Sequence, residues 1–190
     1  FLEKSGMTGP IPILHLALPL GISFYTFQSI GYLIDVYREK FEPERNPAKY
    51  ALFVSFFPQL IQGPISFYDQ LAHQLYAERN FSYKNLKHGT LLMLWGYFKK
   101  MVIADRAVSL IQMVAPDYMQ YNGTVIFITV LVYALQLYAD FSGGIDISRG
   151  FAEILGIEMA ENFCRPYFAV SINDYWRRWH ITLGAWMKNY

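Results

Sequence analysis

Three long stretches of the chain contain no Asp, Glu, Lys or Arg. They are residues 5–34, 50–68 and 118–139, which are 30, 19 and 22 residues long. A helix needs about 20 mostly apolar residues to cross the ~30 Å hydrocarbon core of a bilayer. One such stretch would also fit a helix buried in a soluble protein, but the short polar remainder of this chain is too small to cover three. We therefore predict an all-α fold of the polytopic integral membrane class.

The composition supports this class and excludes others. Charged residues make up 16% of the 190 residues, against about 25% in an average soluble domain. The low charge excludes a disordered chain, and a net charge of +1 leaves no broad basic surface for nucleic acid. The single cysteine, Cys164, excludes an internal disulfide. No linker or repeat divides the chain, so we expect one domain over residues 1–190, incomplete at both ends and central in a longer protein.

Prolines and glycines interrupt two of the charge-free stretches. Residues 50–68 contain Pro58, Gly63 and Pro64, and residues 11–34 contain two prolines and two glycines. Proline removes a backbone donor and clashes with the preceding turn, and broken backbone in lipid must be shielded by protein or line a cavity. We therefore expect broken helices in both stretches.

The distribution of Lys and Arg between the stretches favours a re-entrant hairpin. Residues 36–49, 69–88 and 149–178 carry several Lys or Arg, whereas residues 116–123 carry none. Basic loops favour the cytoplasmic side of a membrane. If residues 50–68 enter the bilayer and return, every basic loop is cytoplasmic and only residues 116–123 lie outside.

Charged residues also interrupt residues 89–115, and two arrangements stay open there. In the first, residues 91–98 lie along the cytoplasmic surface and a span begins near Met101. In the second, one helix continues through the region and buries a charge pair such as Asp105 and Arg106. Both arrangements place residues 116–123 outside.

Asp140 ends the cleanest apolar run and is followed by Gly143 and Gly144. An ionisable residue inside a membrane is costly and is a functional candidate for that reason. Two interpretations stay open. Asp140 either ends a helix at the interface and caps the next element, or forms the polar wall of a water-filled cavity.

Residues 171–190 predict an amphipathic helix that carries a histidine beside its aromatic face. Ser171 and Asp174 have the spacing of a capping box, which marks the start of a helix. Spacings of three and four residues then build an apolar stripe from Ile172, Tyr175, Trp176, Trp179, Leu183, Trp186 and Tyr190. On one continuous helix, His180 lies about 80° from the centre of this stripe. An interfacial helix with Trp and Arg at the lipid headgroups has the same pattern.

His180 is the candidate for acid–base chemistry. Burial beside tryptophans and the presence of nearby arginines both favour the neutral imidazole, which is the form that a general base requires. The histidines of the chain do not share a helix at metal-ligand spacing, so we expect no metal site.

Six motifs in the same order resemble those of the membrane-bound O-acyltransferase family. They are residues 19–27 (PLGISFYTF), 57–65 (FPQLIQGPI), 98–106 (FKKMVIADR), 140–143 (DFSG), 161–167 (ENFCRPY) and 176–181 (WRRWHI). The most similar branch is the bacterial one that contains alginate O-acetyltransferase and the teichoic-acid D-alanyl transfer protein.

This resemblance implies an enzyme that moves an acyl group, acetyl in our prediction, from a thioester donor to a hydroxyl of a cell-surface polysaccharide. The family's site lies in a funnel or tunnel through a many-helix membrane core. His180 matches the first of two signature histidines. No residue here matches the second, which is usually assigned as the catalytic base, so the chain alone is expected to be inactive.

The predicted site follows from these matches. We expect His180 to be catalytic and the following side chains to bind substrate: Trp176, Arg177, Arg178, Trp179, Asp140 and Asn162. The arginines or the indole N–H groups would stabilise the negative charge that develops on the attacked thioester carbonyl. We expect no bound cofactor, with acyl-CoA or an acyl carrier as co-substrate.

The expected partners are the lipid bilayer of the inner or plasma membrane, which the chain crosses several times, the polysaccharide acceptor, and a partner acyltransferase or carrier protein. Two other functional classes stay open from the residues alone. Broken helices and Asp140 are also typical of a transporter or channel segment, and a basic face is compatible with a non-catalytic membrane scaffold.

Overall fold

The computed structural model describes residues 21–60 and 62–190, and the regular structure of these residues is helical. The α-helices are α1 (Ile22–Tyr37), α2 (Pro47–Val54), α3 (Phe57–Leu60), α4 (Tyr68–Tyr76), α5 (Tyr83–Tyr97), α6 (Asp105–Val114), α7 (Gly123–Ile154), α8 (Ile172–Arg178) and α9 (Ile181–Asn189). A π-helix, η2 (Phe98–Ala104), and two 3₁₀ helices, η3 (Tyr118–Gln120) and η4 (Pro166–Phe168), complete the set. The predicted all-α fold is confirmed for these residues. Residues 11–20 of the predicted broken stretch 11–34, with both of its prolines, lie outside them, and α1 runs unbroken over residues 22–34, through Gly31.

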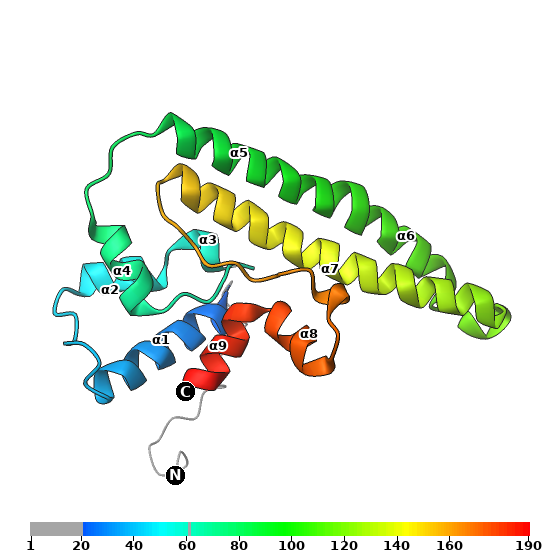
Figure 1. Ribbon diagram of the computed structural model, residues 1–190, viewed down its shortest axis with the longest axis horizontal. Helices are drawn as coiled ribbons and strands as arrows, with labels where there is room; N and C mark the ends of the chain where they lie inside the picture. Colours follow the sequence, from blue (N-terminus) through cyan, green and yellow to red (C-terminus); the bar gives the residue numbers. More distant parts are fainter. Residues whose placement is uncertain (1–20, 61) are drawn as a thin grey trace, which may run out of the picture.

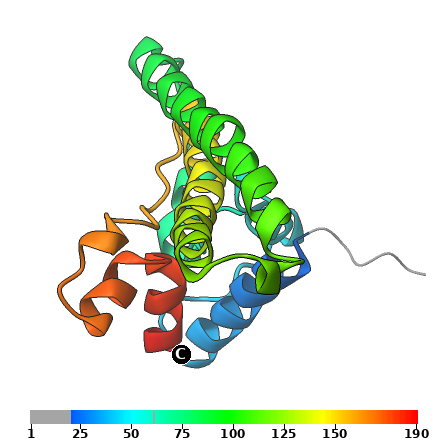
Figure 2. The ribbon, with the colours of Figure 1, turned by 90° about the vertical axis from the view of Figure 1, so that its right-hand side faces the viewer.

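A long antiparallel helical hairpin dominates the molecule (Figure 1). α5, η2 and α6 follow one another along one arm, and α7 forms the other arm beside them, as the end-on view in Figure 2 also shows. Two pairs of glycines, Gly89 with Gly150 and Gly96 with Gly143, bring the two backbones into contact. A Cβ atom on Gly96 would lie only 2.6 Å from the carbonyl oxygen of Gly143, so only glycine permits this approach.

The first arm decides between the two arrangements that the sequence left open for residues 89–115. The chain stays helical through Met101, so the arrangement in which a span begins there is wrong. One helical arm continues, as in the second arrangement, but Asp105 and Arg106 are both exposed. The buried charge is instead Lys99, which is only 7% exposed and lies in the π-helical segment facing α7.

The second arm, α7, is the one helix in the described ranges that is long and apolar enough to cross a membrane by itself. Asn122 caps its start by accepting a hydrogen bond from the Val125 N–H (3.0 Å). The helix then continues past Asp140 to Ile154, so the interpretation of Asp140 as a helix end is wrong. Gly143 and Gly144 do not end the helix because they serve close packing, Gly143 on Gly96 and Gly144 on the Gln62 side chain.

α2, α4, the end of α7 and the segment that follows it build the main apolar core. Its buried members are Phe53, Phe56, Leu71, Ala152, Ile157 and Met159. The predicted break in residues 50–68 is confirmed, because α2 ends at Val54, α3 is four residues long, and the described residues 62–67 before α4 are not helical. The path of this segment relative to a bilayer stays a prediction.

The structure contradicts the prediction of one continuous helix over residues 171–190. Ser171 does cap a helix start, accepting from the Asp174 N–H at 3.1 Å. However, α8 ends at Arg178 and α9 begins at Ile181. Trp179 is extended and forms an isolated antiparallel bridge with Phe163, and His180 has φ of 47°, in the left-handed region. The angle of 80° inferred for His180 therefore does not apply.

α9, which follows the break, lies beside α1 and is held in place by it (Figure 1). The Trp186 Nε1–H donates to the backbone oxygen of Phe27 (3.1 Å), and the Tyr190 hydroxyl donates to Asp35 (2.8 Å). These contacts span more than 150 residues of sequence, so the segment that follows His180 is held by the first described helix.

Candidate active site

His180 lies in the break between α8 and α9, where its backbone replaces helical hydrogen bonds with bonds to the segment before η4. The Ile181 N–H donates to the Asn162 carbonyl (3.0 Å), and the Cys164 N–H donates to the Arg178 carbonyl (2.9 Å). A left-handed non-glycine residue is strained and persists only where its surroundings hold it. These two bonds supply that support at His180.

The ring of His180 packs against α7. Its centroid lies 4.9 Å from that of Phe141, edge to face at 89°. Trp179, which is 9% exposed, packs in turn against Phe163 (4.9 Å between centroids) and stacks on Tyr175 (5.7 Å). The aromatic residues therefore hold the break against the middle of α7, next to the two glycines of the hairpin.

One buried amide organises the polar side of the site. Asn162 is 1% exposed, and its Oδ1 accepts from the Thr182 N–H (3.0 Å) and the Thr182 hydroxyl (2.9 Å). The His180 Nδ1 lies 3.2 Å from the same oxygen. Because a backbone N–H can only donate, the amide oxygen must face Thr182, and His180 must then donate its Nδ1–H to it. Nε2 is thus the nitrogen of the neutral ring that carries the free lone pair.

Burial lowers the pKa of His180 below the usual imidazole value of about 6.5. Desolvation disfavours the charged form, so the ring is neutral at neutral pH. The sequence suggested burial and nearby arginines as reasons for a neutral His180, and in the structure burial is the cause of the lowered pKa, while Arg178 is paired with Asp174 and Arg177 is exposed.

The structure does not gather all the predicted binding residues around His180. Trp176 is 60% exposed and Arg177 is exposed, both on the outer face of α8. Arg178 forms an ion pair with Asp174 (2.9 Å) one turn back along α8. Of the residues predicted to bind substrate, Asn162 and Trp179 lie beside His180, and the role of each in binding stays a prediction.

Asp140 belongs to a charged network across the hairpin. It pairs with Lys100 (2.7 Å), which also meets Asp105 (2.9 Å). Lys99, buried one residue before, pairs with Asp146 (2.6 Å) and donates to the Ser142 hydroxyl (3.0 Å). In the sequence these two lysines interrupt an apolar region and lie in the motif of residues 98–106. Neither feature shows that Asp140 and Asp146, which lie 40 and 47 residues further along the chain, are their partners.

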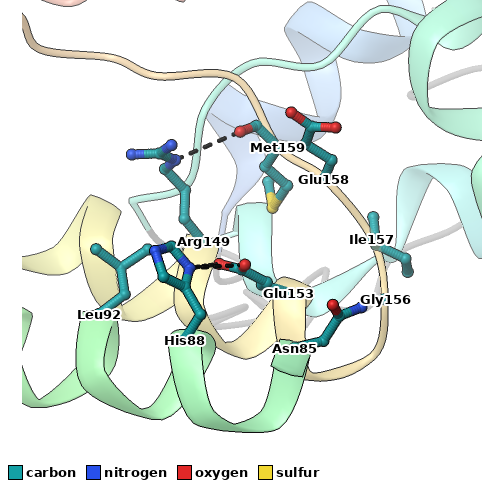
Figure 3. A pocket seen from close by; sticks show the side chains of 9 residues that line it. All are labelled: Asn85, His88, Leu92, Arg149, Glu153, Gly156, Ile157, Glu158 and Met159. Carbon is teal, nitrogen blue, oxygen red and sulfur yellow. Dashed lines mark hydrogen bonds and ion pairs between the residues drawn. The ribbon is translucent and has the colours of Figure 1, made fainter. Parts of the chain in front are cut away.

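A polar pocket of about 300 Å³ lies between α5 and the segment that follows α7 (Figure 3). His88 of α5 and Glu153 of α7 face each other there at 2.7 Å, while Glu158 and Met159 lie on the opposite side. The Nε–H of Arg149 donates to the Met159 carbonyl (3.3 Å). The pocket does not include His180, and its wall is the segment that continues into Asn162.

Comparison with known proteins decides the family. The model of the membrane-bound O-acyltransferase family matches residues 43–190. The chain belongs to this family. The family is one of membrane-bound proteins, and His180, Asn162 and the charged network of the hairpin all lie within the matched residues.

Curated relatives carry names from three related activities. The chain is 39% identical to a probable alginate O-acetylase of Pseudomonas fluorescens over 98% of its residues, and 38% identical to a peptidoglycan O-acetyltransferase of Helicobacter pylori over 93%. It is 28% identical to a teichoic acid D-alanyltransferase of Bacillus subtilis over 90%. The chain spans 37%, 38% and 44% of these relatives' own lengths.

Proposed function

We propose that this chain forms part of a membrane O-acyltransferase that moves an acetyl group from a thioester donor to a hydroxyl of a cell-surface polymer. The family supports acyl transfer, and the relatives with higher identity are named for O-acetylation, whereas the relative named for D-alanyl transfer is less similar. The observation that carries the proposal is the neutral His180, which directs a hydrogen bond to Asn162 through Nδ1 and leaves Nε2 free.

The chemistry requires this kind of group. A sugar hydroxyl is a poor nucleophile at neutral pH, and a positioned base contributes about 10²–10⁴-fold to its reaction. In the proposed step, Nε2 accepts the hydroxyl proton as the hydroxyl oxygen bonds to the thioester carbonyl carbon. The carbon–sulfur bond then breaks, and the proton passes to the departing sulfur, which leaves as a thiol. The products are an O-acetyl ester and the free thiol of the donor.

The setting of the reaction follows the same proposal. The donor is acetyl-CoA or an acetylated carrier, the acceptor is a polysaccharide or glycan, and the protein lies in the plasma membrane with several crossings. A partner acyltransferase or carrier protein completes the pathway of the acetyl group. The exposed apolar surface of α7 supports lipid or further membrane helices around the hairpin. Asp140, paired with Lys100, would form the polar wall of a water-filled cavity within this apolar surface.

The test uses the complete protein in proteoliposomes with acetyl-CoA as donor and either alginate or peptidoglycan fragments as acceptor. His180→Gln removes the proton acceptor, and we expect O-acetyl ester formation to fall by about 10²–10⁴-fold. His88→Gln is the matched control, because it makes the same substitution at an exposed histidine outside the site. Unchanged ester formation by a folded His180→Gln protein would contradict the proposed role of His180.

A further inference from the structure

We infer that Asn162 and Thr182 are positioning residues that act on the reaction through His180, and that they link it to the backbone of Ile65. This inference rests on the proposed function, because it assigns the supports of the same imidazole. It replaces the expectation that Asn162 contacts the substrate.

The burial of Asn162 argues against direct contact with a substrate. The residue is 1% exposed, and its Nδ2 is buried without a hydrogen-bond partner among the described residues. Its Oδ1 is occupied by two donors from Thr182 and one from His180. The amide therefore presents no exposed polar atom for a substrate to contact, and its oxygen is already bonded to His180 and to the start of α9.

Thr182 completes the connection. Its hydroxyl donates to Asn162 (2.9 Å) and accepts from the Ile65 N–H (3.1 Å), which lies 117 residues earlier in the chain. Thr182 is itself buried, at 4% exposure. The hydroxyl therefore has no room to exchange these two partners for water, and it joins the broken segment 57–65 to the histidine through one amide.

The consequence is a fixed tautomer. Because the Thr182 N–H faces the amide oxygen, the oxygen cannot turn away, and His180 can satisfy its Nδ1 only by donating from it. A base that carries its proton on the wrong nitrogen loses its function even when its position is unchanged. Asn162 and Thr182 thus determine which nitrogen of His180 faces the reacting hydroxyl.

Thr182→Val and Thr182→Ser form the first test, in the complete protein. Valine keeps the shape and the backbone N–H, and therefore the tautomer of His180, but it removes the hydroxyl that joins Asn162 to Ile65. Because the amide then holds His180 less firmly in place, we expect kcat to fall about tenfold with KM unchanged, the rate equivalent of one hydrogen bond. Serine keeps the hydroxyl, and we expect its kcat within about twofold of the wild type, since no hydrogen bond is lost. Equal kcat for valine and wild type, or a rise in KM at constant kcat, would overturn the inference.

Asn162→Asp and Asn162→Ala form the second test. A carboxylate beside Nδ1 favours the imidazolium, so the acid limb of the kcat profile should move up by about 1–3 pH units. Alanine removes the acceptor, and ¹⁵N NMR of histidine-labelled protein, with His180→Gln to identify the signal, should change from a single Nδ1–H tautomer to a mixture. An unmoved acid limb or an unchanged tautomer would overturn the inference.

The two proposals fail in different ways. If His180→Gln keeps full activity, the proposed role of His180 fails, while the NMR signal still reports whether Asn162 sets the tautomer. If His180→Gln is inactive and the Thr182 and Asn162 variants behave as wild type, the positioning inference alone fails.

Discussion

The hairpin of α5, η2, α6 and α7 and the break around His180 solve the same problem in different ways. Both bury polar groups beside apolar surface. In the hairpin, regular helices satisfy the backbone, and side-chain charges meet across the glycine contact, as in Lys99 with Asp146 at 2.6 Å. Around His180 the helix is interrupted, and a single neutral amide, Asn162, accepts hydrogen bonds from the side chains of His180 and Thr182 and from the backbone N–H of Thr182.

The hairpin therefore serves as a scaffold, and the segment around His180 serves as the candidate site. The glycine pairs leave the two arms of the hairpin no freedom to slide or separate without losing backbone contact. The His180 segment packs on this scaffold through Phe141 and a few hydrogen bonds. These contacts set the orientation of the imidazole and therefore the position of its Nε2. We therefore expect substitutions in the hairpin to change stability and substitutions near His180 to change activity.

The largest loss of stability is expected from Lys99→Met. It leaves the Asp146 carboxylate, whose side chain is 14% exposed, with Arg149 at 3.9 Å as its remaining ion-pair partner. Removing one partner of a buried ion pair costs about 3–5 kcal/mol of unfolding free energy. Denaturant titration of the complete protein in mixed micelles measures it.

Two further variants sharpen this prediction. Lys99→Met with Asp146→Leu removes both charges, and apolar replacement of a whole buried pair is often neutral, so most of the stability should return. Lys100→Met is the control at a less buried lysine, whose side chain is 43% exposed, and it should cost at most about 1 kcal/mol. If Lys99→Met and Lys100→Met cost the same, burial of the Lys99 pair is not what stabilises the hairpin.

Gly96→Ala is expected to have the next largest effect. Its Cβ would lie 2.6 Å from the Gly143 carbonyl oxygen, and backbone cannot move aside as a flexible side chain does. Overpacking of this kind costs about 1–3 kcal/mol. Thermal unfolding followed by size-exclusion chromatography gives the loss.

Gly123→Ala is the matched control at the start of α7. A Cβ there meets nothing within 4 Å, so alanine should be neutral or raise stability by up to about 1 kcal/mol through helix propensity. Similar stability of the two alanine variants would show that the arms of the hairpin are not held at backbone contact.

The sequence predicts the scaffold better than the site. Charge-free length, prolines and the cap at Ser171 are local signals, and they correctly indicate helices, the break in residues 50–68 and the start of α8. The end of α8 has no local signal. Trp179 and His180 are neither Gly nor Pro, and the aromatic spacing continues through the break. What interrupts the helix is pairing with Asn162 and Phe163, which lie 16 to 18 residues away.

The same limit explains the corrections in the hairpin. Gly143 and Gly144 resemble a helix end because the sequence does not show that Gly96 and Gln62 pack against them. Lys99 looks like an interruption of a span because Asp146 is far along the chain. Thr182 carries no signal at all, since a lone threonine in a helix acquires its role only from Asn162 and Ile65.

A matched pair of helix caps compares the two regions directly. Ser171 caps α8 and Ser82 caps α5, each accepting a hydrogen bond from the N–H three residues later. Replacing either by alanine should cost about 1 kcal/mol of stability. Ser171→Ala should also reduce acetyl transfer, because α8 leads into His180, whereas Ser82→Ala should not. Equal activity of the two variants would contradict the separation of scaffold from site.

The smallest expected effect is on the pH dependence of the acetyl-transfer rate. It tests whether the region around His180 favours the neutral imidazole. An imidazole with the usual pKa of about 6.5 is half protonated at pH 6.5 and would lose half of a rate that needs its free Nε2. Burial lowers the pKa of His180, so more than half of the ring stays neutral at that pH, and the loss begins only under more acidic conditions. The rate at pH 6.5 should therefore exceed half of the rate at pH 8, a change of less than about twofold. The ¹⁵N titration of His180, with its signal identified by His180→Gln, provides the measurement. A midpoint at or above pH 6.5 would contradict the prediction, because the region around His180 would then stabilise a cation, as the ion pairs of the hairpin do.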